Sequence, residues 1–228
     1  MLDVMLFAVW PYVALAIFVV GTIWRWRTDQ FGWTTRTSEL SERRILVWAA
    51  PTFHLGVLLV VVGHLVGLLV PKAATTAMGV PEGLYHGLAA GLGIVAGAVL
   101  VVGVVALVLR RFVLHSRLRL ATRPADVAMY AVLVIQMILG LWQTVGYTLF
   151  SVQPGFDYRE SVSIWFRSLF YLHPDAALMG SAPLAFELHA IVAFVFFAIW
   201  PFSRLVHVWS APVGYPTRPA IVYRHQGA

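Results

Sequence analysis

Five long apolar runs dominate this sequence and leave only short connections between them. The runs cover residues 4–24, 48–70, 84–109, 126–150 and 183–209. Each is near or above the roughly 20 apolar residues that an α-helix needs to cross a bilayer. Because a membrane interior offers backbone groups no water, runs of this length are helical. The pattern predicts an all-α integral membrane protein with five transmembrane helices, built as a single membrane domain over residues 1–228 with a tail at 210–228.

Composition excludes the other broad classes. Hydrophobic residues make up 60% of the chain and charged residues only 11%, whereas soluble domains carry about 25% charged residues. The net charge of +6 does not indicate nucleic-acid binding, because the arginines lie in the connections between apolar runs, where membrane topology explains them. The absence of cysteine excludes disulfides, iron–sulfur clusters and covalently attached haem, so any redox cofactor is held by other side chains.

The distribution of basic residues predicts the orientation in the membrane. Of the sixteen lysines and arginines, thirteen lie in residues 25–47, 110–125 and 204–228. The other three are Lys72, Arg159 and Arg167. Because cytoplasmic connections collect basic residues, we expect the N-terminus outside and the C-terminus in the cytoplasm of a multi-pass protein of the inner cell membrane. The first run has no basic residue before it and is expected to be a retained anchor.

Four histidines lie inside the predicted spans, His54 and His64 in the second and His189 and His207 in the fifth. Ionisable groups inside a membrane are costly and usually functional. The second and fifth helices run in opposite directions, so depth matching pairs His64 with His189 near the outside and His54 with His207 near the inside. The axial spacings differ, about 15 Å against about 27 Å on straight helices, and a kink at Pro201 would absorb the difference.

Two imidazole pairs at two depths indicate two haems between the second and fifth helices, because haem iron takes two axial ligands. Zinc fits less well, since it needs a compact set of ligands. The competing interpretation of each histidine is a hydrogen bond between helices. Gly56, Gly63 and Gly67 would let a flat porphyrin approach the second helix. Arg204, one turn before His207, is placed either to meet a haem propionate or to serve as a cytoplasmic flank.

The remaining histidines are expected to be solvated side chains at membrane edges or in connections and not haem ligands. They are His86, His115, His173 and His225. In the connection between the fourth and fifth runs, residues 161–172 are expected to form an amphipathic helix on the membrane surface. Its membrane face would carry Trp165, Phe166 and Phe170.

Several of these segments resemble a known family. They are Gly63-His64-Leu65-Val66-Gly67, Glu187-Leu188-His189, the stretch from Pro201 to Ser210 that contains Ser203-Arg204-Leu205-Val206-His207-Val208-Trp209-Ser210, and the tail from Pro212 to Arg218. The chain resembles the gamma subunit, the cytochrome b membrane anchor, of respiratory nitrate reductase over nearly its whole length.

The resemblance implies two b-type haems, the outer held by His64 and His189 and the inner by His54 and His207. It also implies that quinol is oxidised to quinone near the outer haem. Electrons would then pass inward to an iron–sulfur beta subunit and a molybdenum-containing alpha subunit on the cytoplasmic side.

The chain departs from this family near the start of the third helix. Family members can carry a lysine at the quinol site there, but residues 82–86 contain none. We expect quinol to bind in a pocket bounded by Gly63, Gly67 and the start of this helix. His86 is the first candidate to take a quinol proton, with Glu82 and Tyr85 in reserve.

Two other functions remain open. One is the anchor of a related molybdenum enzyme, such as a nitrite oxidase or a chlorate or perchlorate reductase, because the substrate is chosen on another chain. The other is a haem-free transporter or structural anchor that uses the histidines for proton relay or helix packing. An optical spectrum of the purified protein separates the haem-free function from the first two.

Overall fold

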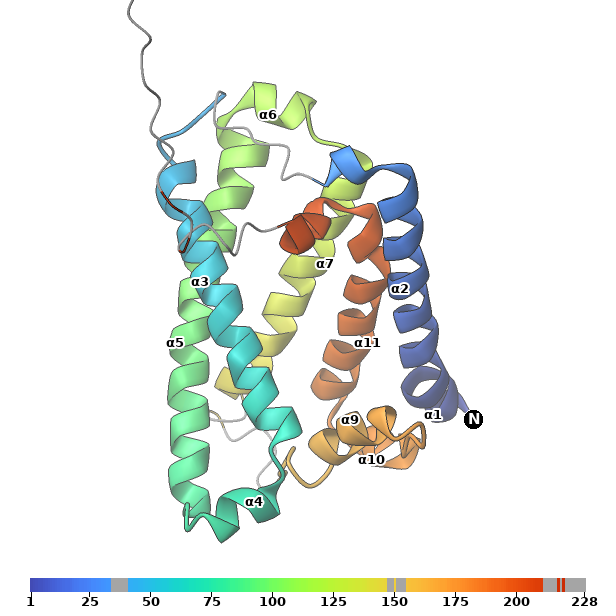
Figure 1. Ribbon diagram of the computed structural model, residues 1–228. Helices are drawn as coiled ribbons and strands as arrows, with labels where there is room; N and C mark the ends of the chain where they lie inside the picture. Colours follow the sequence, from blue (N-terminus) through green and yellow to red (C-terminus); the bar gives the residue numbers. More distant parts are fainter. Residues whose placement is uncertain (34–40, 147–149, 151–154, 211–216, 218, 220–228) are drawn as a thin grey trace, which may run out of the picture.

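Figure 1 shows the computed structural model, which describes residues 1–33, 41–146, 150, 155–210, 217 and 219. All regular elements within these ranges are helices. Five of them are long and apolar enough to cross a membrane: Leu2–Thr28, Leu46–Leu69, Glu82–Leu114, Pro124–Gly146 and Leu184–Phe202. Within the described residues, the prediction of an all-helical fold with five helices that could cross a membrane is therefore confirmed.

The five long helices contain several stretches of α, π and 3-10 geometry. In chain order they comprise α1 (Leu2–Val4), η1 (Met5–Val9) and α2 (Trp10–Thr28); α3 (Leu46–His64) and η3 (Leu65–Leu69); α5 (Glu82–Val108) and η4 (Leu109–Leu114); α7 (Pro124–Leu141) and η5 (Trp142–Gly146); and α11 (Leu184–Ile199) and η6 (Trp200–Phe202). The short connecting helices are η2 (Gln30–Gly32), α4 (Lys72–Ala77), α6 (Ser116–Leu120), α9 (Val162–Phe170), α10 (Ala176–Gly180) and η7 (Arg204–Ser210).

Prolines mark the starts of the last three long helices. Pro81 and Pro183 are the residues immediately before α5 and α11, and Pro124 is the first residue of α7. Proline suits these places because the first backbone N–H groups of a helix have no partner within the helix. At α7 the Asp126 carboxylate accepts a hydrogen bond from the Arg123 backbone N–H, at 3.2 Å.

The third long helix packs closely along the second. A Cβ atom at Gly56 would lie 2.6 Å from the Leu100 Cα, and one at Gly103 would lie 2.5 Å from the Phe53 backbone nitrogen. Glycine at both places lets the two helix backbones approach. The same contacts fix the register of the antiparallel pair, in which residues 56 and 53 face 100 and 103, so that residue 70 is level with residue 86.

The other three long helices form the second part of the bundle. α11 packs between α2 and α7, and α7 contacts α5, which joins the two parts (Figure 1). We call the end of the bundle that holds α6 the arginine-rich end, and the end that holds the N-terminus, α4, α9 and α10 the N-terminal end.

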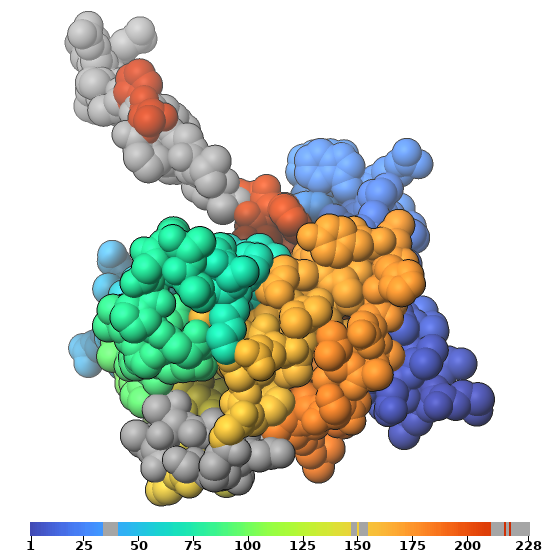
Figure 2. All heavy atoms as spheres, turned by 90° about the horizontal axis from the view of Figure 1, so that it is seen from below, coloured from blue at the N-terminus to red at the C-terminus, as the bar shows by residue number. Residues whose placement is uncertain are grey.

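The N-terminal end is covered by α4 with the start of α5 and, beside them, by residues 155–180 (Figure 2). The expected helix at residues 161–172 is present as α9, but one of its aromatic residues does not face a membrane. Trp165 is 2% exposed, packs against Phe7 and Phe194, and donates a hydrogen bond to the Phe7 carbonyl oxygen. Phe170 remains 67% exposed. The expectation that Trp165 faces the membrane is therefore wrong, because its indole N–H is hydrogen-bonded to the first long helix in the interior.

The predicted fifth span at 183–209 is wrong at its C-terminal end. α11 ends at Ile199, η6 ends at Phe202, and Ser203 is extended. Pro201 stands at the break and has no backbone N–H to continue the helix, and the guanidinium of Arg25 of α2 donates to the carbonyl oxygens of Pro201 and Ser203 at 2.7 and 2.8 Å. These bonds satisfy carbonyls that a continuing helix would have engaged.

After this break, η7 carries His207 and is not a continuation of α11. On one straight helix the eighteen residues from His189 to His207 would make five turns and place both side chains on the same face, but the break puts the two histidines on separate helices. The predicted tail at 210–228 lies outside the described residues, apart from Ser210, Thr217 and Pro219.

Candidate functional site

The four histidines of the predicted spans lie as two pairs. The ring centroids of His64 and His189 are 6.0 Å apart, with the planes inclined by 15°. Those of His54 and His207 are also 6.0 Å apart, with the planes at 83°. These are the two pairs that depth matching predicted.

The ring separation suits a metal between two imidazoles. A bond from an imidazole nitrogen to a metal is about 2 Å long, so two such bonds in line, with half of each ring, give centroids about 6 Å apart. Rings in direct contact have centroids about 4.5–7 Å apart as well, so the separation leaves room for a metal but does not by itself require one. Each pair would supply two nitrogen ligands to an iron.

The hydrogen bonds of three of the rings leave a nitrogen for a metal. Nδ1 of His54 lies 2.7 Å from the Ala50 carbonyl oxygen, Nδ1 of His64 lies 2.8 Å from that of Val60, and Nδ1 of His207 lies 2.7 Å from that of Arg204. A carbonyl oxygen only accepts, so the proton belongs on Nδ1 and the lone pair on Nε2. Ligating histidines are typically oriented in this way by a backbone carbonyl.

His189 has a different partner on α7. Its Nε2 lies 3.0 Å from the amide nitrogen of Gln136, while its Nδ1 and the Gln136 Oε1 are buried without a hydrogen-bond partner among the described residues. Buried polar atoms are rarely left unpaired. Gln136 is the residue that holds this ring. With its amide nitrogen as donor, Nε2 uses the lone pair of the ring and Nδ1 carries the proton; with the amide turned so that Oε1 accepts from Nε2–H, the Nδ1 lone pair is left for a metal.

The break in the fifth helix removes the discrepancy in axial spacing. His54 and His64 are ten residues apart on α3, about 15 Å. From His189, α11 continues for ten residues to Ile199, which is about the same length. The chain then turns across the end of the bundle in η7, so His207 arrives level with His54 and not some 27 Å beyond His189.

Arg204, the expected propionate partner, is engaged by a protein carboxylate. Its Nε and Nη2 lie 3.0 and 2.7 Å from the two oxygens of the buried Asp126, and Arg111 lies 3.4 Å from the same carboxylate. Two arginines therefore share one aspartate near the inner pair. The propionate contact stays a prediction. Of the glycines expected to admit a porphyrin, Gly56 is used in packing α3 on α5, whereas a Cβ at Gly63 would meet no atom within 4 Å.

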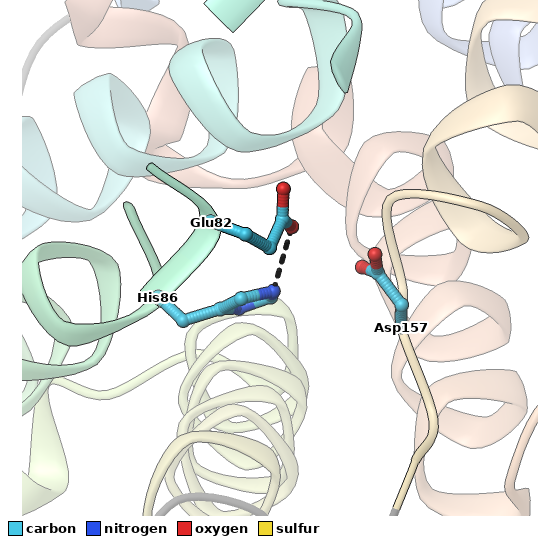
Figure 3. Close-up of side chains that lie close together, drawn as sticks. All are labelled: Glu82, His86 and Asp157. Carbon is cyan, nitrogen blue, oxygen red and sulfur yellow. Dashed lines mark ion pairs between the residues drawn. The ribbon is translucent and has the colours of Figure 1, made fainter. Parts of the chain in front are cut away.

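A second cluster of polar side chains lies at the N-terminal end. Glu82 and His86 lie one turn apart at the start of α5, and Asp157 faces them from the connection before α9 (Figure 3). One ligand atom from each lies within 4.8 Å of the others. The distance from His86 Nε2 to Glu82 Oε1 is 2.9 Å. By the register of α3 and α5, His86 is level with Val70, six residues or roughly 9 Å beyond His64.

Lys72 of α4 joins this cluster. Its amine lies 2.8 Å from Asp157, 2.6 Å from Glu160 and 3.7 Å from Glu82. Its hydrogen bonds to Asp157 and Glu160 raise the pKa of Lys72 above its ordinary value. Burial favours the neutral form of Asp157, but hydrogen bonds from Lys72 and the Arg159 backbone outweigh it and hold the pKa of Asp157 below its ordinary value. Both groups are charged at neutral pH.

The buried guanidinium of Arg159 lies beneath the same cluster. It stacks on the Tyr85 ring at 3.7 Å, donates to Thr75 at 2.7 Å and lies 3.5 Å from Glu82. The Tyr85 hydroxyl is 3.4 Å from that of Tyr158. Tyr85, a reserve candidate for quinol contact, is therefore part of the packing of the N-terminal end.

Sequence reasoning missed most of this second cluster. Lys72, Asp157, Tyr158 and Arg159 are separated from Glu82 and His86 along the chain, and only the fold brings them together. One signal was available: the segment 157–160 is a run of four polar residues in a chain poor in charge. Gln136 also had a signal, since an amide inside an apolar span needs a partner.

Comparison with known proteins gives one family. The family model of the nitrate reductase gamma subunit matches residues 3–226. The chain is 41% identical to the nitrate reductase gamma chain of Bacillus subtilis over 96% of each protein, and 33% identical to the respiratory nitrate reductase 1 gamma chain of Escherichia coli over 95% of each. It is 45% identical over 225 residues to the nitrate reductase-like protein NarX of Mycobacterium tuberculosis, spanning 98% of this chain but only 34% of that protein.

Proposed function

This chain belongs to the nitrate reductase gamma subunit family, and on that basis we propose that it is a di-haem cytochrome b subunit. It oxidises quinol at the outer membrane face and passes the electrons inward to a molybdenum nitrate reductase. The observation that carries the proposal is that four histidines form two pairs at two depths of the bundle, with the ring centroids 6.0 Å apart within each pair. When bound, the two haems supply one-electron carriers across the bilayer.

The proposed orientation places the arginine-rich end in the cytoplasm. Six arginines at that end are exposed: Arg27, Arg43, Arg44, Arg117, Arg119 and Arg123. At the N-terminal end, each of the three basic residues is held by protein groups: Lys72 by carboxylates, Arg159 by Thr75 and Tyr85, and Arg167 by the Leu68 carbonyl oxygen. This asymmetry supports the orientation, because exposed basic residues collect on the cytoplasmic side.

The proposed quinol site lies between the His64 and His189 pair and the outer surface of the membrane. Quinol oxidation releases two protons and two electrons. Release of the protons outside, while the electrons travel inward, separates charge across the membrane. Two observations support this site. A Cβ at Gly63 would meet no atom within 4 Å, and His86 lies roughly 9 Å farther toward the outer surface than His64. His86 is the proposed acceptor of a quinol proton.

The electrons need partner subunits on the cytoplasmic side. Because the chain has no cysteine, it cannot hold an iron–sulfur cluster through thiolates. We propose that an iron–sulfur beta subunit docks on the exposed arginines and the tail, and that it passes electrons to a molybdenum-containing alpha subunit. Cross-links from the beta subunit should form at the arginine-rich end. Cross-links only at Lys72 or Arg159 would reverse the proposed orientation.

The optical spectrum of the purified protein tests the proposed function. We expect b-type haem absorption whose reduced-form bands are lost on oxidation and return when quinol is added. Quantitation of extracted haem should give two per chain. A protein that is folded and inserted but has no haem bands would show that the function is wrong and would favour the haem-free alternative.

A further inference from the structure

We propose that Glu82 and His86 form a proton-accepting pair, and that the cluster of Lys72, Asp157 and Glu160 is the outlet through which quinol protons reach the outer surface. This inference rests on the proposed quinol oxidation. It extends the proposed site, in which His86 accepts a quinol proton, with the path by which that proton reaches the outer surface.

The first step of the path is the contact between imidazole and carboxylate. His86 Nε2 and Glu82 Oε1 are 2.9 Å apart, within the distance of proton transfer, although the two groups are not aligned as a hydrogen bond and Glu82 Oε1 has no hydrogen-bond partner among the described residues. Both side chains come from the first turns of α5, so one rigid helix fixes their separation. Glu82 lies one turn closer to the outer surface than His86. In the proposed orientation, a proton that moves from His86 to Glu82 therefore moves outward.

The second step joins Glu82 to the outer surface. The Lys72 amine lies between Glu82, at 3.7 Å, and Glu160, at 2.6 Å, and Glu160 is 64% exposed. Lys72 keeps its proton because its pKa is raised, so it holds the carboxylates in place and does not itself take the quinol proton. Glu160 supplies the contact with bulk water.

Arg159 indicates that water enters the cluster. Its side chain is 1% exposed, yet Nε and Nη1 have no hydrogen-bond partner among the described residues, and Nη1 lies 3.5 Å from Glu82. Buried N–H groups in this situation are normally satisfied by ordered water. Water held between Arg159 and Glu82 is the carrier that a proton path needs.

The neighbouring hydroxyls do not compete for the proton. Burial and the hydrogen bond to Tyr85 raise the pKa of Tyr158, so its hydroxyl stays protonated near neutral pH. The titratable and charged groups that face the pair come from α4, α5 and the connection before α9. They are Lys72, Tyr85, Asp157, Tyr158, Arg159 and Glu160.

The reaction balances with the named acceptors. Each quinol breaks two O–H bonds and becomes quinone. Its two electrons pass through the haems and the iron–sulfur subunit to nitrate at the molybdenum subunit. Its two protons pass in turn from the quinol oxygen to His86, then to Glu82, and leave as hydronium at the outer surface.

The test uses the full complex in sealed vesicles. Glu82→Gln and His86→Gln should each slow quinol-driven haem reduction about 100-fold, within the usual range for loss of a proton acceptor. The rate should also lose most of its rise with pH. The haem spectra, and haem reduction by a chemical reductant that carries no proton, should stay unchanged. His173→Gln is the matched control, because His173 is exposed and lies outside the cluster.

Two further variants keep the inference testable. Glu82→Asp retains a carboxylate and should keep most of the rate, and added imidazole should restore part of the rate of His86→Gln. Unaltered quinol-driven rates and pH profiles in Glu82→Gln and His86→Gln would overturn the proton path. Absence of quinol-driven haem reduction in the unaltered complex would instead overturn the proposed function. If Glu82→Gln does not assemble, His86→Gln with and without imidazole decides the question.

Discussion

Asp126 at the start of α7 holds Arg204 at the start of η7 through both carboxylate oxygens, at 3.0 and 2.7 Å. The backbone carbonyl oxygen of Arg204 in turn accepts a hydrogen bond from Nδ1–H of His207. A buried carboxylate on one helix therefore fixes the short segment that carries a proposed haem ligand. Since Arg111 also contacts Asp126, removal of this carboxylate leaves two arginines without their shared counter-charge.

Asp126→Asn should destabilise the folded protein by about 3–5 kcal/mol, because it leaves buried charge uncompensated. It should also loosen His207 and lower the occupancy of the inner haem while the outer haem stays bound. Thermal unfolding in detergent and haem spectra measure the two effects. In the double variant with Arg204→Gln, part of the lost stability should return, since one of the two arginine charges that Asp126 balanced is then gone and only that of Arg111 is left. A double variant less stable than either single variant would contradict the conclusion that Asp126 stabilises the fold by holding Arg204.

Substitutions of the histidines should fall into two groups. His54→Leu and His207→Leu should each remove one spectral component, and His64→Leu and His189→Leu should each remove the other. The reason is that each haem loses one of its two axial bonds. Redox titration followed by optical spectroscopy separates the components.

His115→Leu is the control, because His115 lies in the connection after η4 and should leave both components intact. Loss of the same component from His54→Leu and His189→Leu would refute the pairing.

The close contact between α3 and α5 should not tolerate a side chain at Gly56. Gly56→Ala places a Cβ 2.6 Å from the Leu100 Cα, and backbone atoms cannot move aside without separating the helices. We expect a loss of about 1–3 kcal/mol, as for other overpacked sites. Thermal unfolding of the detergent-solubilised protein measures it.

Gly91→Ala is the matched control on α5, because a Cβ there meets no atom within 4 Å. This change should be neutral or stabilising by up to about 1 kcal/mol, since alanine favours a helix over glycine. Equal destabilisation by both changes would show that general helix effects, and not the contact with Leu100, decide the result.

The ion pair of Lys72 and Asp157 should make stability depend on pH. The folded pKa of Asp157 is depressed, below the value of about 3.9 of the unfolded chain. Ionised Asp157 therefore stabilises the fold above about pH 4, and this contribution is lost as the pH falls through the folded pKa. Lys72→Gln removes a group that lowers this pKa.

Thermal unfolding of the two proteins measured between about pH 7 and pH 3 tests this ion pair. Lys72→Gln should unfold at a lower temperature at neutral pH, and the gap should narrow as the pH falls. A gap that stays constant over the whole range would show that Lys72 stabilises the fold without Asp157 ionisation.

The sequence by itself determined the number of membrane-spanning helices and the prolines at which three of them begin. It also determined which histidines share a depth. These features depend on local composition, on the length of apolar runs and on the fixed rise of a helix, and all of them can be read from neighbouring residues. The family resemblance was carried in the same way, by short segments around His64 and His207.

Only the tertiary structure decided where the fifth helix ends and what the polar groups contact. Apolar residues continue past Pro201, but the chain turns away there, and Arg25, 176 positions away in the chain, binds the Pro201 carbonyl oxygen at the turn. Likewise, Asp126 reaches Arg204 across 78 positions and Lys72 reaches Asp157 across 85. Hydropathy and helical period describe one segment at a time. The partner of a buried charge or a free carbonyl depends on which segments pack together, and that packing is a property of the whole bundle.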